Sequence, residues 1–356
     1  MREFLIRKQD AGQRFDKYLK RILPDASTGF LYKMLRKKNI TLNDKKAEGK
    51  ELLKERDSVK LYFSEETFLK FSGENQNQTM DISDYVNAFR SLKAIDVIFR
   101  NEDILILNKP AGMLSQKAKE TDLSVNEWMI GYLLEEKTVS PDSLKRFKPS
   151  VCNRLDRNTS GLILCGISLP GTRTLSKLLK TRNLHKYYIT YVQGCFPGKV
   201  HEKGYLVKDK ASNKVSIYHR KEDIPQKALE DAEMIETEIR PIAMDEKRQI
   251  SKLEVLLITG KSHQIRAHLA SMGYPILGDR KYGVEFDIKR CDDKDTEEKI
   301  HDLMKSGYQL LHAYKVVFPA EMDERKELSG KTFYAPIPDT FTKLEETICL
   351  HGVPEA

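Results

Sequence analysis

The chain of 356 residues has no long hydrophobic run, and nothing in it approaches the roughly 18 consecutive apolar residues that a membrane-spanning helix needs. Its first residues, MREFLIRKQD, lack the apolar stretch and the small-residue cleavage site of a secretion signal. Its five cysteines form no C-x-x-C pair, and an odd, scattered set suits reduced thiols better than a disulfide framework or a structural zinc site. These absences argue against a membrane or secreted protein and predict a cytoplasmic one.

The composition is that of a globular protein with more than one domain. Hydrophobic residues make up 40% of the chain and charged residues 32%, so it can bury a core. The length fits about two folding units of roughly 150 residues. The net charge of +8 is unevenly placed, because residues 1–64 hold 17 Lys and Arg against 9 Asp and Glu while the rest is balanced. This asymmetry predicts a phosphate-binding module in front of a neutral body, since lysine and arginine neutralise the phosphates of nucleic acids. A basic face that serves only solubility is the alternative interpretation of the charge.

The hydrophobic spacing of residues 1–64 predicts two helices followed by a small sheet. Apolar residues recur at helical intervals in FDKYLKRI and LYKML, and they alternate as in strands in ITL and SVKLYF. That order, with GQRFDKYL opening the first helix and RKKNITLND crossing from helix to strand, resembles the small RNA-binding domain first described in ribosomal protein S-four. The resemblance implies that basic side chains of the helices contact RNA. They are Arg14, Lys17, Arg36, Lys37 and Lys38.

Two features of this module leave room for other interpretations. Arg36, Lys37 and Lys38 could simply complement the negative end of the second helix dipole. Asn39 stands where the related domains have the glycine of a turn. Asparagine tolerates left-handed backbone geometry, so we expect the turn to survive this change.

The middle of the chain predicts a change of domain. Residues 65–91 mix polar residues, glycine and amides without a sustained period and are predicted to form a linker. Residues 92–350 are predicted to form the second domain, which opens near the strand-like run IDVIFRNEDILILNKPAG. Within it, the charged stretch 285–308 predicts a surface insertion or an exposed helix.

The segment KPSVCNRLDRNTSGLILCG, at 148–166, places a carboxylate where a strand meets a turn. Asp156 stands there between Arg154 and Arg157. Charge-assisted hydrogen bonds at such a point favour the anionic carboxylate and hold it in position. A surface ion-pair cluster would produce the same local pattern.

The segment HKYYITYVQG, at 185–194, has the pattern of a strand. Alternation puts Lys186 and Tyr188 on one face and Tyr187 on the other. A tyrosine ring can stack on a nucleobase, and a neighbouring lysine can meet a phosphate. An ordinary strand tyrosine that fills the core is the alternative interpretation of Tyr188.

The segment SKLEVLLITGKSHQIRAHLASMGYPILGDRKYG, at 251–283, predicts a strand and then a short helix that Ser262 caps and Gly273 ends. The helix carries Arg266. His263 and His268 are five residues apart, about 140° around a helix, so they are poor partners for one metal ion. Hydrogen bonding and packing are the roles that we expect for both histidines.

Together these three segments resemble the RluA family of pseudouridine synthases, whose signature runs H-R-L-D-x-x-T-S-G, K-x-Y and G-x-x-H-Q-I-R-x-H-L, followed by G-D-x-x-Y-G. The matching stretches are NRLDRNTSG, KYY, GKSHQIRAHL and GDRKYG, and LILNKPAG and LHAYKVVFP also agree, within about residues 95–320. The resemblance implies an α+β fold with a mixed, largely antiparallel sheet and flanking helices, preceded by the small α+β RNA-binding domain.

The resemblance also implies a role for each matching residue. Asp156 corresponds to the catalytic aspartate and Tyr188 to the tyrosine that stacks on the base. Arg266 corresponds to the arginine paired with the catalytic carboxylate. Arg154 corresponds to the arginine that helps to displace the target nucleotide from its helix.

Other positions concern RNA contacts and departures from the family pattern. Lys109, in the opening motif, and Lys186 are expected to contact RNA. Asn153 replaces the usual histidine of the first motif, and Asn158 stands where Asp is common. Any role of that histidine in holding the loop must therefore pass to an amide.

The reaction that the resemblance implies is the isomerisation of uridine to pseudouridine in structured RNA, without cofactor or metal. A basic module in front of a synthase favours large-subunit ribosomal RNA as substrate, with transfer RNA as the alternative. We expect a monomer with no obligatory protein partner. Residue types leave open whether Asp156 attacks C1′ or removes the 2′ proton, because an aspartate can do either.

Two functions from other classes compete with this prediction. A non-catalytic RNA-binding or ribosome-assembly factor on the same fold would be signalled by loss of Asp156, Tyr188 or Arg266, and all three are present. A metal-dependent nuclease would need clustered Asp, Glu or His ligands, which the sequence does not show at ligand spacing.

Overall fold

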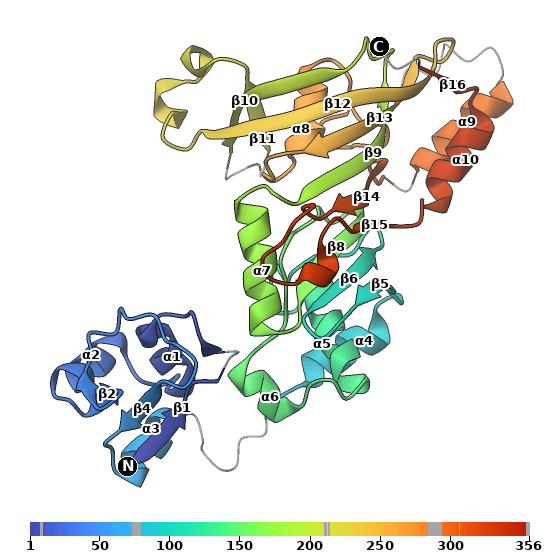
Figure 1. Ribbon diagram of the computed structural model, residues 1–356. Coiled ribbons are helices and arrows are strands. Elements are labelled where there is room, and N and C mark those ends of the chain that lie inside the picture. The colour runs from blue at the N-terminus through green and yellow to red at the C-terminus, as the bar shows by residue number, and fades with distance from the viewer. Residues whose placement is uncertain are drawn as a thin grey trace.

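The computed structural model describes residues 1–7, 10–72, 80–209, 212, 214–283, 294–305 and 307–353. It contains two units, each with its own sheet and hydrophobic core (Figure 1). The elements of the N-terminal unit are β1 (Arg2–Leu5), α1 (Phe15–Ile22), α2 (Thr28–Arg36), β2 (Ile40–Leu42), β3 (Lys45–Lys46), β4 (Ser58–Leu61) and α3 (Glu65–Ser72).

The N-terminal unit is a four-stranded antiparallel sheet packed against helices, with strand order β1-β4-β2-β3. Phe15 and Leu19 of α1 and Leu35 of α2 are buried in its core, which confirms the helical spacing. The prediction that helices come first was wrong, because β1 precedes them and pairs with β4. None of the four residues of β1 is fully buried, so it carries too weak a pattern to be recognised without its distant partner.

The turn after α2 differs in detail from the expectation. Lys38 has a positive φ of 58°, and Asn39 does not share the left-handed conformation. The backbone amide of Asn39 instead donates to the carbonyl of Met34 at 2.9 Å, closing the end of the helix. A lysine tolerates this conformation at a cost of roughly 1 kcal/mol, and glycine is not required.

The larger unit consists of one extended sheet with flanking helices. Its helices are α4 (Ser83–Ser91), α5 (Val125–Glu135), α6 (Pro141–Arg146), α7 (Leu169–Lys180), α8 (Gln264–Ser271), α9 (Lys294–Met304) and α10 (Asp339–Thr347). Its strands are β5 (Asp96–Arg100), β6 (Ile104–Lys109), β7 (Ser150–Val151), β8 (Ser160–Gly166), β9 (His185–Gln193), β10 (Val200–Lys208), β11 (Val215–Tyr218), β12 (Glu233–Asp245), β13 (Ile250–Leu257), β14 (Leu311–Val317), β15 (Thr332–Tyr334) and β16 (His351–Gly352).

The sheet of the larger unit runs β11-β10-β12-β13-β9-β14-β8-β6-β5, with β7, β15 and β16 pairing beside this path. Among its described strand pairs, β8 and β14 are parallel and the others are antiparallel. The predicted mixed, largely antiparallel sheet with flanking helices is therefore confirmed.

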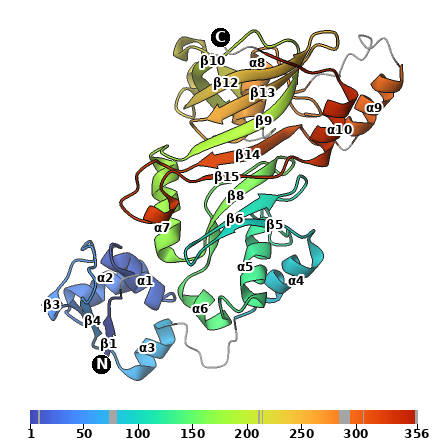
Figure 2. The same cartoon turned by 45° about the vertical axis from the view of Figure 1, so that its right-hand side comes forward.

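The β5-β6-β8 part of the sheet is covered on both faces. Leu105 and Leu107 of β6 pack in the core that contains α5, whereas Ile104 and Ile106 pack in the core that contains α7. A strand buried on both faces reads as a continuous apolar run, which explains the sequence ILIL. Figure 2 shows α7 and α5 on opposite sides of this part of the sheet.

The predicted linker, 65–91, has a helix at each end. Phe68 of α3 packs in the N-terminal core, and Tyr85 of α4 packs in the core of the larger unit. Residues 73–79, between them, lie outside the described residues. In the charged stretch 285–308, the described part forms α9, whose Ile300 packs in a core that also contains Phe341 and Leu344 of α10.

Two features of the described residues concern membrane spans and cysteines. Across the described ranges, no helix is long and apolar enough to cross a membrane. Four cysteines, Cys152, Cys165, Cys195 and Cys349, are free thiols, and Cys291 lies outside the described residues.

Candidate active site

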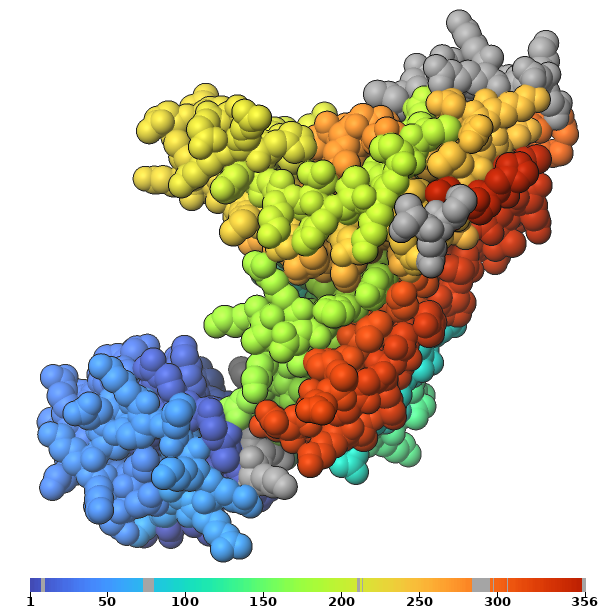
Figure 3. Space-filling view, turned by 45° about the horizontal axis from the view of Figure 1, so that its top comes forward, coloured from blue at the N-terminus to red at the C-terminus, as the bar shows by residue number. Residues whose placement is uncertain are grey.

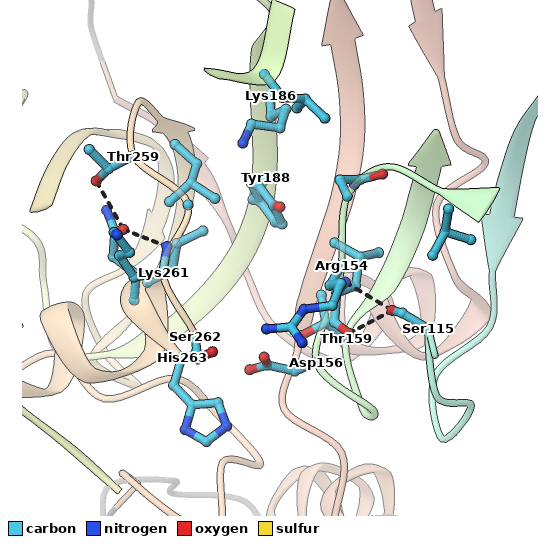
Figure 4. Close-up of a pocket in the computed structure, with 18 of the residues that line it drawn as sticks. Ser115, Arg154, Asp156, Thr159, Lys186, Tyr188, Thr259, Lys261, Ser262 and His263 are labelled. Carbon is cyan, nitrogen blue, oxygen red and sulfur yellow. Dashed lines mark hydrogen bonds between the residues drawn. The ribbon is translucent and has the colours of Figure 1, made fainter. Parts of the chain in front are cut away.

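A pocket of about 950 Å³ opens in the larger unit between the Asp156 loop, strand β9 and the segment that leads into α8 (Figure 4). Asp156 is the only acidic residue among the described residues that line it. Nine lysines and arginines line the same pocket, so its positive charge suits a polyanion. They are Lys117, Arg154, Arg157, Lys180, Arg182, Lys186, Lys208, Lys261 and Arg266.

The Asp156 loop joins β7 to β8 and is fastened by side chains from distant segments. The Ser115 hydroxyl donates to the carbonyl of Leu155 at 2.8 Å and accepts from its amide at 3.0 Å. The Gln309 amide donates to the hydroxyl of Thr159 at 3.0 Å. These contacts fix the backbone on both sides of Asp156. Neither Ser115 nor Gln309 has a signal in the local sequence, so sequence reasoning missed both.

Asn153 holds the same loop against β8. Its side-chain oxygen accepts from the amide of Leu164 at 2.7 Å, and its side-chain nitrogen donates to the carbonyl of Leu162 at 3.3 Å. An amide therefore bridges the loop and the strand, as expected for the position where related sequences have histidine.

Asp156 is held by an arginine that a second carboxylate orients. Nη1 of Arg266 donates to Asp156 at 2.8 Å, while Nε and Nη2 donate to the two oxygens of Asp279 at 2.7 and 2.8 Å. Asp279 also accepts from the backbone amides of Lys281 and Tyr282 at 2.9 and 3.2 Å. All three nitrogens of the fork are thus engaged, and the guanidinium has little freedom to rotate.

The pKa shifts of Arg266 and Asp279 agree with these hydrogen bonds. Burial of Arg266 disfavours its charge, but the hydrogen bonds and charges of Asp279 and Asp156 raise its pKa above the ordinary value. Burial of Asp279 also opposes its ionisation, and the hydrogen bonds and charge of Arg266 hold its pKa below the ordinary value. The motif GDRKYG contains Asp279, so the sequence carried a signal for this residue, but only the fold assigns it to Arg266.

The turn into α8 is built differently from the expectation. Ser262 does not cap the helix, because α8 begins at Gln264 after His263, whose φ is 57°. The buried Gln264 side chain accepts from the amide of Lys261 at 3.1 Å and from the hydroxyl of Thr259 at 3.0 Å. Gly273, with a φ of 86°, follows the end of the helix as predicted. Arg266 therefore lies in the first helical turn.

Strand β9 presents Tyr188 and Lys186 to the pocket, as the alternation predicts (Figure 4). Tyr187 lies on the other face, where the ammonium of Lys315 sits 3.9 Å from its ring centre. Burial and the charge of Asp156 raise the pKa of Tyr188, and burial lowers the pKa of Lys186 to about 8. Tyr188 is 5% exposed, so it serves both as a core residue and as part of the pocket wall.

Arg154 is exposed, and its guanidinium points into the pocket between Tyr188 and Asp156 (Figure 4). The pocket thus gathers one fixed carboxylate, one tyrosine and nine cations. A sugar can approach the carboxylate while the surrounding cations meet phosphates. This arrangement suits chemistry on a nucleotide.

Comparison with known proteins gives a consistent result. A family model described as RNA pseudouridylate synthase matches residues 103–271. An uncharacterized RNA pseudouridine synthase of Mycoplasma genitalium is 26% identical over 89% of this chain and 89% of its own length. Ribosomal large subunit pseudouridine synthase C of Rickettsia bellii is 26% identical over 93% of this chain and 96% of its own. These similarities identify the protein as an RNA pseudouridine synthase.

Solved structures show the same fold for this synthase. Human RNA Pseudouridylate Synthase Domain Containing 4 has a TM-score of 0.55 at 19% identity, covering 76% of this chain and 98% of that one. Human RNA Pseudouridylate Synthase Domain Containing 1 has a TM-score of 0.51 at 17% identity, covering 75% and 92%. The synthase isomerises uridine in RNA to pseudouridine.

The cations predicted to contact RNA in the N-terminal unit of the synthase lie on its surface. Arg14 pairs with Asp16 at 2.6 Å, so part of its charge is neutralised. Lys17, on α1, is exposed. At the end of α2 and just beyond it, Arg36, Lys37 and Lys38 are all exposed. The cations at the end of α2 are thus accessible to phosphates.

Lys109 does not fit its predicted role of contacting RNA. Its side chain is fully buried, and Nζ donates to the carbonyls of Pro110, Met113 and Arg157 at 2.7 to 2.9 Å. Burial lowers the pKa of Lys109 to about 7, while the charge of Asp156 opposes that shift. Three carbonyl acceptors need all three protons of an ammonium. Lys109 therefore ties the opening motif to the Asp156 loop and has no surface to offer RNA.

Replacing Lys109 with methionine is expected to lower the free energy of unfolding by about 3 kcal/mol, because three buried carbonyls lose their donor. Urea unfolding measures the change. Methionine at the exposed Lys93 is the matched control and should leave the unfolding midpoint in place. An equal midpoint for both variants would show that the Lys109 contacts do not stabilise the loop.

The histidines of the third segment have structural partners, as expected. Nδ1 of His263 lies 2.9 Å from the hydroxyl of Tyr282, and Nδ1 of the buried His268 lies 3.2 Å from the hydroxyl of Thr237. Among the residues that the structure describes, no group of three or more His, Cys, Asp or Glu side chains could hold a metal ion.

Proposed function

We propose that the pocket receives a uridine displaced from a folded RNA and that Asp156 is the catalytic carboxylate. The observation that carries the proposal is the fork of Arg266, which is oriented by Asp279 and holds Asp156 in a pocket where lysines and arginines line the wall and no other acidic described residue does. Fixing the carboxylate before the substrate arrives avoids reorganisation during the reaction.

The isomerisation breaks the bond between N1 of uracil and C1′ of the ribose and forms a bond between C5 and C1′. A proton leaves C5 and one is gained at N1, so nothing is added to or lost from the RNA. In our proposal Asp156 acts at the sugar, and Tyr188 stacks on the uracil while it turns. Arg154 fills part of the space that the displaced nucleotide leaves in the RNA helix. Unstacking the base from that helix costs a few kcal/mol.

We further propose that the natural substrate is large-subunit ribosomal RNA. Two kinds of observation support this. Relatives that cover most of the chain carry the name ribosomal large subunit pseudouridine synthase, C in Rickettsia bellii and D in Neisseria meningitidis. Residues 1–64 of the N-terminal unit also carry the whole excess of positive charge. We propose that it is an RNA-binding domain like that of ribosomal protein S-four, joined to a catalytic domain at 92–350.

We also propose that the protein acts as a monomer that needs no protein partner. Mapping pseudouridines in the RNA of a deletion strain, with and without a plasmid copy of the gene, tests the proposed substrate. We expect specific sites in large-subunit ribosomal RNA to lose pseudouridine and regain it on complementation. Loss confined to transfer RNA would contradict the substrate, and no loss anywhere would favour a non-catalytic factor.

Removing residues 1–72 is expected to weaken binding to large-subunit ribosomal RNA and to flatten its salt dependence. The deletion includes α3, because Phe68 packs in the N-terminal core. Each phosphate contact contributes roughly 0.7 to 0.9 to the slope of log affinity against log salt, so losing four contacts lowers the slope by about 3. Filter binding across a salt series measures it. A short stem-loop that reaches only the pocket is the control, and equal slopes on the long RNA would contradict the tethering role.

A further inference from the structure

Helix α7 carries only cations among its charged side chains. Its sequence, LPGTRTLSKLLK, contains no Asp or Glu, and Arg173, Lys177 and Lys180 recur at intervals of four and three residues. That spacing puts all three on one face of the helix. The opposite face is buried, with Leu175 and Leu178 packed against β6 and β8. Helix packing therefore orients the cationic face of α7 outward.

The two ends of this face lead to the two parts of the molecule that the proposed function assigns to RNA. At one end, Nη1 of Arg173 donates to the carbonyl of Ala11 in the N-terminal unit. At the other end, Lys180 and the following Arg182 line the pocket. From Arg173 to Lys180 the helix rises by about 10 Å. Figure 3 shows the surface hollowed between the N-terminal unit and the arm that contains β10 and β11, with α7 in between (Figure 1).

Lys177 and Lys180 are the accessible charges of this face. Both side chains are exposed. Arg173 is half-buried against Ala11, and Arg182 lies 3.7 Å from Glu236, which also binds His201. The charges of these two lysines are therefore the most available for binding the phosphates of an RNA backbone.

We propose that the outward face of α7 binds the sugar-phosphate backbone of the same RNA whose uridine enters the pocket, between the N-terminal unit and the active site. This inference rests on the proposed function and adds the path of the substrate to it. Lysines on flexible stems suit backbone phosphates, which carry no sequence information, so α7 holds the RNA in register without selecting bases. The continuity of the face with the cationic pocket favours RNA over an acidic protein as the occupant.

The test replaces both lysines, Lys177→Gln and Lys180→Gln, in the full-length protein. Glutamine keeps helix propensity and removes charge. With large-subunit ribosomal RNA purified from the deletion strain as probe, the slope of log affinity against log salt is expected to fall by about 1.5, since each lost phosphate contact removes roughly 0.7 to 0.9. With a short stem-loop that reaches only the pocket, which Lys180 also lines, the slope is expected to fall by no more than about 0.8, half of the loss on the long RNA.

A charge-matched control is Lys93→Gln with Lys343→Gln, two exposed lysines outside α7, of which the first lies just after α4 and the second on α10. If the control pair lowers the slope as much as the α7 pair, the effect is general electrostatics and the inference fails. If the α7 pair leaves the slope unchanged, the inference also fails. Because binding is measured separately from chemistry, absence of pseudouridine with the unaltered protein would count against the proposed function, while the salt slopes still decide the role of α7.

Discussion

Replacing Asp156 with asparagine is expected to abolish pseudouridine formation while leaving folding and RNA binding nearly intact. The amide keeps the shape of the side chain, and its oxygen can still accept from Nη1 of Arg266. It lacks the negative charge that the reaction at C1′ needs. Removing a residue that acts directly on the reacting atoms costs roughly 10⁴-fold or more in rate.

Single-turnover conversion of a uridine-containing stem-loop, with enzyme in excess, measures this loss. Binding to the same RNA should change little, because the nine cations that line the pocket are untouched. The exposed Asp142, changed to asparagine, is the matched control and should react at the normal rate. Normal turnover by the Asp156 variant would remove Asp156 from the chemistry and leave the pocket without an assigned carboxylate.

Replacing Arg266 with lysine is expected to lower the single-turnover rate by two or more orders of magnitude with little change in RNA affinity. Arg266 meets Asp156 with one nitrogen and Asp279 with two, in fixed directions. A lysine offers one flexible point charge, so it cannot hold both carboxylates in this geometry. A misplacement of about 1 Å at the reacting group can cost roughly 100-fold.

The Arg266→Lys variant also distinguishes two roles for Arg266: orienting Asp156 and binding a phosphate of the RNA. If Arg266 mainly contacted phosphate, lysine would substitute well and any deficit would appear in binding. A near-normal single-turnover rate at saturating enzyme, with weaker binding, would therefore show that Arg266 is not needed to orient Asp156. Both quantities must be measured on one RNA, because steady-state rates mix binding with chemistry.

The Arg266 variant should also depend less on pH in its stability than the unaltered protein does. Arg266 holds the pKa of Asp279 below its unfolded value, so the stabilisation is fully present above the unfolded pKa, near 4, and is lost as the pH falls through the folded pKa. With lysine in place, the folded pKa of Asp279 rises and less of this stabilisation remains to be lost. The variant should therefore be less stable near neutral pH, with a smaller further loss on acidification.

Several parts of the site could be predicted because they depend on neighbours in the sequence. The alternation of HKYYITYVQG placed Tyr188 and Lys186 on one face, and the structure has both in the pocket wall. Asp156 was expected between a strand and a turn, and it lies between β7 and β8. Short-range periodicity is a property of the backbone, so such features need no tertiary information.

Other parts could not be predicted because they depend on pairing over long distances. β1 is ordered by β4, more than fifty residues later, and its four residues carry no pattern of their own. Lys109 was expected to contact RNA, and lysine is in general mostly an exposed residue, yet here three buried carbonyls accept its protons. The fastening of the Asp156 loop by Ser115 and Gln309 likewise comes from residues far away in the chain.

By itself, the sequence determined the class of the molecule: a charged N-terminal module, an α+β catalytic unit, and the motifs that contain Asp156, Tyr188 and Arg266. Only the tertiary structure decided which groups act together. Arg266 and Asp156 are 110 residues apart, and Asp279 orients the pair from a separate turn. Hydrogen bonds and ion pairs of this kind depend on distances that arise once the sheet has brought its strands together, so no local pattern encodes them.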